Sequence, residues 1–419
     1  MRRIAAVCAV ALVGGMVVTP SAVAKPPAGA CNSADPGMQT VSTMPWAQRT
    51  FDPRRAVWPH STGRGVVVAV VGSGVDADHP QLRGAVLRGT DFHFEGSLPG
   101  NFDCDSQGTA VASLIAARPR AGVGFAGLAP GAEVLPVRVS DRSATAFGPG
   151  EQVTSRHVAS GIRYAAEQGA DVIAVTLASS HSIARVRDAV EYARKRDAVV
   201  VAAVGGADDE GAGASYPAGY PGVLGVAAVN YRGTLDQSRV SPHTDVVAPG
   251  ADVLAAARER GHNYYSGSEF AAGFVAATAA LVRAQHPTMK AGKVVQRILA
   301  TADPSRGLGY GKGMVNPHRA LTDKLVDDDP VPLAAMKPRT VDPAYEAAVS
   351  WWRRAGSIAM AVTGLLVLGA VLGLVLVPSV RRARRRRWLP SRAAPVSTER
   401  VVEAPPDEVF LFPKPPAEQ

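Results

Sequence analysis

The sequence is poor in the residue patterns that build metal sites. Its 419 residues contain three cysteines, which lie far apart, and its nine histidines include no pair at the spacing of a zinc site. An acidic cluster is present at Asp323, Asp327, Asp328 and Asp329, but it lacks the glycine and the spaced oxygen ligands of a calcium loop. We interpret this cluster as a solvated linker face. We therefore expect no metal and no cofactor.

A general surplus of positive charge is also missing. The net charge is +9, and nine arginines lie between residues 351 and 397, a stretch without lysine or acid. The rest of the chain therefore carries equal numbers of positive and negative side chains. A basic chain invites comparison with nucleic-acid-binding proteins. Because the surplus is confined to one segment, we exclude nucleic acid as a partner.

Two apolar segments predict the cellular location. Residues 1–24 combine two arginines, an apolar run and Ser-Ala-Val-Ala, which is typical of a secretory signal peptide; a buried helix is the alternative. Residues 356–377 carry no charge, and as a helix they would extend about 33 Å, enough to cross a bilayer. The arginine-rich stretch 381–387 follows directly, and positive residues favour the cytoplasmic side. We expect a single-pass cell-membrane protein with its N-terminal domain outside the cytoplasm.

The cysteines agree with an oxidising compartment. Cys8 would leave with the signal peptide, so Cys31 and Cys104 remain. An even pair in a secreted chain suggests one disulfide, and two free buried thiols are the alternative.

The middle of the chain predicts one large α/β domain. Short apolar runs bounded by turn residues occur at 65–71, 134–139, 171–177, 198–204, 223–229 and 245–248. Helical patterns occur at 109–117, 155–168, 183–196 and 270–286. Continuous apolar strands that alternate with amphipathic helices favour a doubly wound parallel sheet with helices on both faces. To this fold the C-terminal sequence adds one transmembrane helix.

The domain boundaries follow from shifts in composition. Proline-rich segments flank the large domain, and scattered charge with many prolines marks the C-terminal end as disordered. We predict a signal peptide at 1–24, an N-terminal extension at 25–60, the α/β domain at 61–322, a proline-rich linker at 323–355, a transmembrane helix at 356–377 and a basic, then disordered, cytoplasmic tail at 378–419.

Three segments resemble the motif blocks of the subtilisin-like serine proteases, the subtilases. They are Gly72-Ser73-Gly74 after a strand, Gln107-Gly108-Thr109 at the start of a helix, and Gly267-Ser268-Glu269 before a long helix. Their order along the chain and their places on these elements match the family. The resemblance covers residues 42–322 and implies the subtilisin-like fold.

Further motifs resemble a particular group of subtilases, the mycosins. They are Pro45-Trp46-Ala47-Gln48, the acids beside Cys104, the segment 125–130 and the segment 309–317. Mycosins are membrane-anchored subtilases associated with type VII secretion in actinobacteria. The resemblance implies a Cys31–Cys104 disulfide that holds the N-terminal extension, type VII secretion membrane components as partners, and secreted peptides or proteins as further candidates.

The family's chemistry needs an Asp-His-Ser triad, and this sequence departs from it at each position. The histidine removes a proton from the serine hydroxyl, and the aspartate holds the imidazole in the required tautomer. By resemblance, Gly72 stands in place of the aspartate, Gln107 in place of the histidine and Glu269 in place of the serine. None of the three supplies the required group.

The family's oxyanion donor is also replaced. An asparagine normally follows the strand expected at 198–204, and this chain has Gly206 there. Loss of one such donor lowers the rate by about 10²–10³, a magnitude that comes from subtilisin. The segment that binds substrate backbone in the family reads Ala174-Val175-Thr176-Leu177-Ala178 and departs from the family's pattern.

Neighbouring residues do not replace the lost groups. Ser268 lies one residue before the nucleophile position, and one step along a helix turns a side chain by about 100°. We expect Ser268 to cap the helix that begins near Glu269. Acids and a His-Pro pair are ordinary after the first strand of subtilases, so we interpret Asp76, Asp78 and His79 as loop-closing residues.

The sequence therefore predicts an inactive, membrane-anchored subtilase that acts as an extracytoplasmic structural or docking component of a type VII secretion machine. A peptide-binding module that uses the former substrate cleft and a residual serine endopeptidase remain alternatives. Because an unpaired buried charge is costly, we expect Gln107 and Glu269 to hydrogen-bond across the cleft. His243 and His262 are lone loop histidines, for which we expect no catalytic role.

Overall fold

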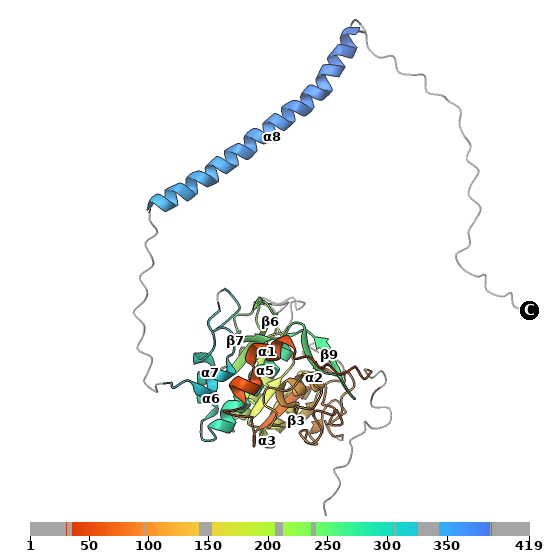
Figure 1. The fold of residues 1–419 in the computed structure, drawn as a ribbon, viewed down its shortest axis with the longest axis vertical. Coiled ribbons are helices and arrows are strands. Elements are labelled where there is room, and N and C mark those ends of the chain that lie inside the picture. The colour runs from red at the N-terminus through yellow and green to blue at the C-terminus, as the bar shows by residue number, and fades with distance from the viewer. Residues whose placement is uncertain are drawn as a thin grey trace, which may run out of the picture. The chain divides into compact units, whose positions relative to one another are not determined.

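The chain divides into two units, residues 1–326 and 327–419, which are described separately (Figure 1). The computed structural model describes residues 31, 36–94, 98–141, 153–205, 213–235, 240–305, 307–325, 343–385 and 387. The predicted signal peptide and most of the predicted tail lie outside these ranges.

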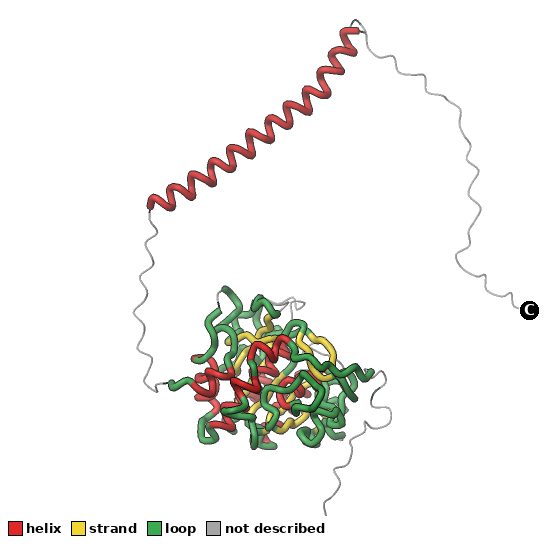
Figure 2. Tube along the Cα trace, viewed as in Figure 1, coloured by secondary structure: helices red, strands yellow, loops and turns green. Residues whose placement is uncertain are grey.

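A seven-stranded parallel sheet forms the centre of the first unit, as predicted (Figures 1 and 2). The strand order is β2-β3-β1-β4-β5-β6-β7. The bounds are β1 Val67–Gly72, β2 Thr90–Asp91, β3 Glu133–Arg138, β4 Val172–Val175, β5 Val199–Ala203, β6 Val223–Val229 and β7 Val246–Pro249. A separate antiparallel pair comprises β8 Val253–Ala256 and β9 His262–Tyr265.

Helices cover both faces of this sheet. The helices are α1 Trp46–Phe51, α2 Gln107–Ala116, α3 Ser155–Glu167, α4 Ala184–Lys195, α5 Ser268–Gln285, α6 Ala291–Ala300 and α7 Pro317–Thr322, and a π-helix, η1, spans Pro53–Val57. Alternate residues of a strand point to opposite faces. Val68 and Val70 of β1 therefore join the core cluster that contains α2 and α5, whereas Ala69 and Val71 join the cluster that contains α3 and α4. This burial on both faces explains the continuous apolar runs in the sequence.

The strand order creates a switch point at β1. β3 pairs with one edge of β1 and β4 pairs with the other. In open α/β sheets, ligands bind outside the carboxyl ends of the strands at such a point. A ligand site is therefore expected near the carboxyl end of β1, at Gly72.

The N-terminal extension packs on the domain. The Trp46 side chain donates a 2.8 Å hydrogen bond to the carbonyl of Asp252, and the Trp58 side chain donates one of 3.0 Å to the carbonyl of Leu128. A disulfide joins Cys31 to Cys104, as the mycosin resemblance implies.

In the described part of the second unit, the chain forms one long helix, α8, spanning Pro343–Arg385 (Figure 2). Its segment Arg354–Arg385 contains an 18-residue window with a mean hydropathy of 2.6 and is long and apolar enough to cross a membrane. The helix extends beyond the predicted span at both ends. Its first turns lie in the region that the sequence analysis interpreted as linker.

Candidate functional site

The first two motif blocks meet through Ser73, which follows the last residue of β1. Its hydroxyl donates a 3.0 Å hydrogen bond to the Asp103 carboxylate and accepts one of 2.9 Å from the Gly108 amide. The end of β1 is therefore fixed to the first turn of α2.

The third block meets the second through the predicted pair. The Gln107 side-chain amide donates a 3.4 Å hydrogen bond to the Glu269 carboxylate. Both residues are buried, with 3% and 5% of their surfaces exposed. The prediction that these residues hydrogen-bond is confirmed.

Burial perturbs the Glu269 carboxyl group. Loss of hydration raises its pKa to about 7, and its own backbone amide and Gln107 partly oppose that rise. A buried carboxylate loses the hydration that stabilises its charge, so the neutral form of the group is favoured. Near neutral pH this group can gain or lose a proton, but its amide partner does not titrate.

The place beside Gly72 is filled by Thr176. A Cβ atom built on Gly72 would lie 2.8 Å from the Thr176 hydroxyl, which donates a 3.0 Å hydrogen bond to the carbonyl of Val71. Any side chain at position 72 would therefore displace Thr176. This contact was not predicted, although Val71 and Val175 are register partners in adjacent strands and Gly72 and Thr176 are the next residues along them.

The prediction for Ser268 was wrong. α5 begins at Ser268 itself, its N-cap is Gly267, and no side chain caps it. The Ser268 hydroxyl instead accepts a 2.9 Å hydrogen bond from the Gly205 amide and approaches the Gly205 carbonyl at 3.3 Å. The serine therefore ties the start of α5 to the loop after β5. Gly206, predicted as the lost oxyanion position, lies outside the described residues.

The residues after β1 build their loop, as interpreted. An Asp76 carboxylate oxygen accepts a 3.0 Å hydrogen bond from the Asp78 amide. Nδ1 of His79 accepts one of 3.2 Å from the Gln81 amide, and its Nε2 lies 3.2 Å from the carbonyl of Gly261. Burial lowers the pKa of His79.

The two lone histidines also have structural partners. Nε2 of His262 lies 2.7 Å from the Gln81 side-chain oxygen, and Nδ1 of His243 accepts a 3.0 Å hydrogen bond from the Ser215 amide. Burial, and to a lesser degree the neighbouring His79, lowers the pKa of His262 to about 4. His262 is therefore neutral at physiological pH.

A buried polar cluster beside the blocks was missed by the sequence analysis. The carboxylate of Asp103 accepts hydrogen bonds from Ser73, from the Asp105 amide, and from both the amide and the hydroxyl of Thr109. Burial next to Asp105 raises the pKa of Asp103 to about 7. Asp103 thus holds the loop between the disulfide and α2.

Arg138, at the end of β3, completes this cluster. Its guanidinium is fully buried, forms a 2.7 Å ion pair with Asp91 and donates a 3.1 Å hydrogen bond to the carbonyl of Ser73. A charged residue within the apolar run at 134–139 was the available signal in the sequence. Within the described ranges, no cluster of three or more His, Cys, Asp or Glu side chains is placed to hold a metal ion.

Comparisons with known proteins identify the family of this chain and several relatives. Residues 63–322 match the Subtilase family. The chain is 34% identical to thermitase of Thermoactinomyces vulgaris over 66% of its own length and 97% of that protein. It is 31% identical to fervidolysin of Fervidobacterium pennivorans over 68% of its own length, but it spans only 45% of that relative.

Solved mycosin structures are also similar. MycP1 from Mycobacterium smegmatis aligns with a TM-score of 0.60 at 25% identity, covering 73% of this chain and 92% of that one. MycP3 from the type VII (ESX-3) secretion system aligns with a TM-score of 0.59 at 29% identity, covering 69% and 91%. A further MycP1 structure, with the same TM-score and identity, is described as a serine protease that is an essential component of the type VII (ESX-1) secretion system.

Proposed function

The chain belongs to the subtilase family, and we propose that it is an inactive relative of the mycosins that serves a type VII secretion machine as an extracytoplasmic docking component. The observation that carries this proposal is the buried contact between Gln107 and Glu269. In an active subtilase, the base and the nucleophile would meet at these two positions.

The side chains at these positions cannot perform the family's acyl transfer. A carboxamide does not accept a proton from a nucleophile at neutral pH, and glycine at position 72 has no group to orient a base. Thr176 fills the space that such a group would need. Subtilisin without its triad retains about 10³–10⁴ over the uncatalysed rate. Any activity left in this chain would be of that order or lower.

The membrane placement supports a docking role. The proposal places the subtilase domain outside the cytoplasm and the arginine-rich end of α8 on the cytoplasmic side, in line with the positive-inside tendency. The similarity to MycP1 and MycP3 supports type VII secretion as the process that the chain serves, because both proteins are described with type VII secretion systems. We infer that the membrane components of such a system are the partners.

Deletion and substitution in the source organism test the proposal. Deletion of the gene should abolish type VII secretion, and both the wild-type chain and Glu269→Ala should restore it, because no catalytic group is removed. Secretion that survives the deletion would refute the docking role. If Glu269→Ala fails to restore secretion although the machine still assembles, the former cleft is required and the peptide-binding alternative replaces the proposal.

A further inference from the structure

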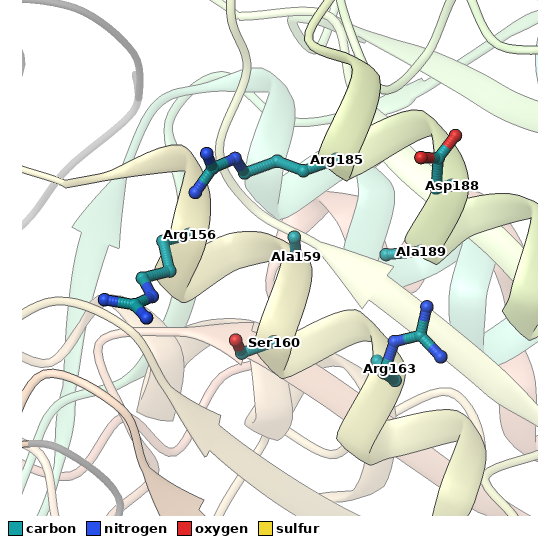
Figure 3. Close-up of a pocket in the computed structure, with 7 residues that line it drawn as sticks. All are labelled: Arg156, Ala159, Ser160, Arg163, Arg185, Asp188 and Ala189. Atoms are coloured by element: carbon teal, nitrogen blue, oxygen red, sulfur yellow. The ribbon is translucent and has the colours of Figure 1, made fainter.

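A groove runs between α3 and α4, on the sheet face opposite α2 and α5. Its volume is about 330 Å³, and the small residues Ala159, Ser160 and Ala189 form its floor (Figure 3). Three arginines rim it: Arg156 and Arg163 from α3, and Arg185 from α4. We call this feature the α3–α4 groove.

The two helices carry an excess of positive charge. From residue 155 to residue 196, all of which are described, seven exposed side chains are cationic and three are acidic. The cations are Arg156, Arg163, Arg185, Arg187, Arg194, Lys195 and Arg196, and the acids are Glu167, Asp188 and Glu191. The total charge outside residues 351–397 is balanced, so that total does not reveal the local excess on α3 and α4.

The basic surface continues across α4. A second groove of about 330 Å³ lies against α4 and is lined by Arg187, Arg194 and Lys195, together with Glu191 and Tyr220. The two grooves share α4, so the basic surface is wider than the α3–α4 groove alone.

The rim arginines are available to a ligand. The exposed acids of α4 are already engaged: Asp188 lies 3.8 Å from Arg187, and Glu191 forms a 2.7 Å pair with Lys195. Among the described residues, no carboxylate lies within ion-pair distance of Arg156, Arg163 or Arg185. Arg163 stacks on the Tyr192 ring at 4.3 Å, which holds its guanidinium in place at the groove.

The spacing of the arginines indicates the shape of the ligand. Arg156 and Arg163 are seven residues apart on α3, or about 10.5 Å at about 1.5 Å per residue. Figure 3 shows Arg185 extending toward the Arg156 end and Arg163 at the other end. In an extended polyproline II segment, which has three residues per turn and rises about 3.1 Å per residue, carboxylates at every third residue lie on one side of the chain and repeat at about 9 Å. Arginine is also well suited to bidentate recognition of carboxylates.

We propose that the α3–α4 groove binds an extended acidic segment of a partner protein, with acids about three residues apart. This inference rests on the proposed docking function and names the surface and the kind of partner. An anionic bilayer fits the surface less well. A bilayer is flat, whereas the α3–α4 groove is a concave feature between two helices.

Binding of a defined probe to the full-length chain, held in zwitterionic nanodiscs, tests the groove. The probe is a fluorescent peptide of repeated Glu-Gly-Ser, and the control peptide has Gln in place of Glu. The binding variant is R156E/R163E/R185E. The matched control R49E/R64E/K312E makes the same charge change at exposed cations elsewhere on the domain.

The acidic peptide should bind at least about tenfold more weakly to the groove variant than to wild type or to the control variant. Its binding should also weaken between about 50 mM and about 300 mM salt, because exposed charges are screened. Equal affinity for the two peptides, or for the two variants, would overturn the proposal. Binding to phosphatidylglycerol vesicles without binding to the peptide would also overturn it. If the glutamate variant does not fold, R156Q/R163Q/R185Q replaces it.

Secretion assays separate this inference from the docking function. If the deletion abolishes secretion but the groove variant restores it fully, the groove is not the docking surface and the docking function stands. If secretion survives the deletion, the docking function fails whatever the groove binds. The inference requires secretion to be lost in the groove variant and retained in the control variant.

Discussion

The side-chain amide of Gln107 donates a 3.4 Å hydrogen bond to the buried carboxylate of Glu269, which joins the first residue of α2 to the second residue of α5. This contact joins two of the three motif blocks through an amide and a carboxyl group. The region is thus built as a packed, hydrogen-bonded junction. Its properties can be tested through stability as well as through activity.

The first prediction concerns the pH dependence of stability. Burial raises the pKa of Glu269 from 4.5 to about 7, so the folded chain binds a proton here more tightly than the unfolded chain does. Stability is therefore highest below about pH 4.5 for this group and falls as the pH rises to about 7, by a total of about 3 kcal/mol. Glu269→Gln removes this loss. It should raise the melting temperature at about pH 8 and change it little at about pH 5.

The comparison needs an exposed acid as its control. Glu167→Gln changes the same functional group at the exposed end of α3, and its effect should be small at both pH values. Asp103 titrates in the same window with the same sign, but it contributes equally to all three proteins. An equal shift for Glu269→Gln at both pH values would contradict the account.

The second prediction concerns the space beside Gly72. Gly72→Ala should destabilise the fold by about 1 kcal/mol or more, because its Cβ atom would displace the Thr176 hydroxyl. Gly292→Ala is the matched control, since its Cβ atom would meet no atom within 4 Å and alanine is favoured in a helix. Urea unfolding should also show a smaller cost for Gly72→Ala in a Thr176→Ala background. An unchanged cost in that background would show that Thr176 does not fill the site.

The third prediction concerns the disulfide. Cys31 and Cys104 are 73 residues apart, so replacing both by serine should lower the free energy of unfolding by about 2–4 kcal/mol. Denaturant titration measures the loss. Cys8→Ser is the control and should leave stability unchanged. If the wild-type chain migrates identically in gel electrophoresis with and without a reductant, that result would contradict the bond.

The fourth prediction concerns the buried ion pair between Arg138 and Asp91. Arg138→Met leaves a buried carboxylate without its partner and should cost about 3–5 kcal/mol. The double variant Arg138→Met/Asp91→Leu should recover much of that loss, because both charges are removed together. Lys195→Ala, which breaks an exposed pair with Glu191, is the control and should cost about 1 kcal/mol or less. A double variant as unstable as Arg138→Met would contradict this explanation.

Local sequence patterns were sufficient to predict most of the fold. The run expected at 223–229 coincides with β6, and the runs expected at 65–71 and 134–139 lie within two residues of β1 and β3. These strands are buried on both faces, so their apolar character is continuous and visible in the sequence. The disulfide was suggested by the cysteine count and implied by the family resemblance. The Gln107–Glu269 contact depended on the resemblance, which supplied the spatial relation between distant segments.

The missed features depend on contacts that no local pattern records. Ser268 was expected to cap α5, but the loop after β5 lies so close that the Gly205 amide donates a hydrogen bond to the Ser268 hydroxyl. Thr176 fills the site beside Gly72 because two strands distant in sequence lie side by side. The α3–α4 groove arises because two helices from different crossover segments place their arginines on one surface. Net charge summed over the chain cannot reveal such a grouping.

Labelling by a fluorophosphonate probe tests the central claim, the loss of catalysis, most directly. The full-length chain is treated with the probe and its intact mass is measured, with active thermitase as the positive control. The account predicts no mass increase for this chain under conditions that label thermitase completely. A stoichiometric adduct on a serine of the native chain would contradict it, if that adduct does not form when the chain is unfolded before labelling or carries Ser268→Ala.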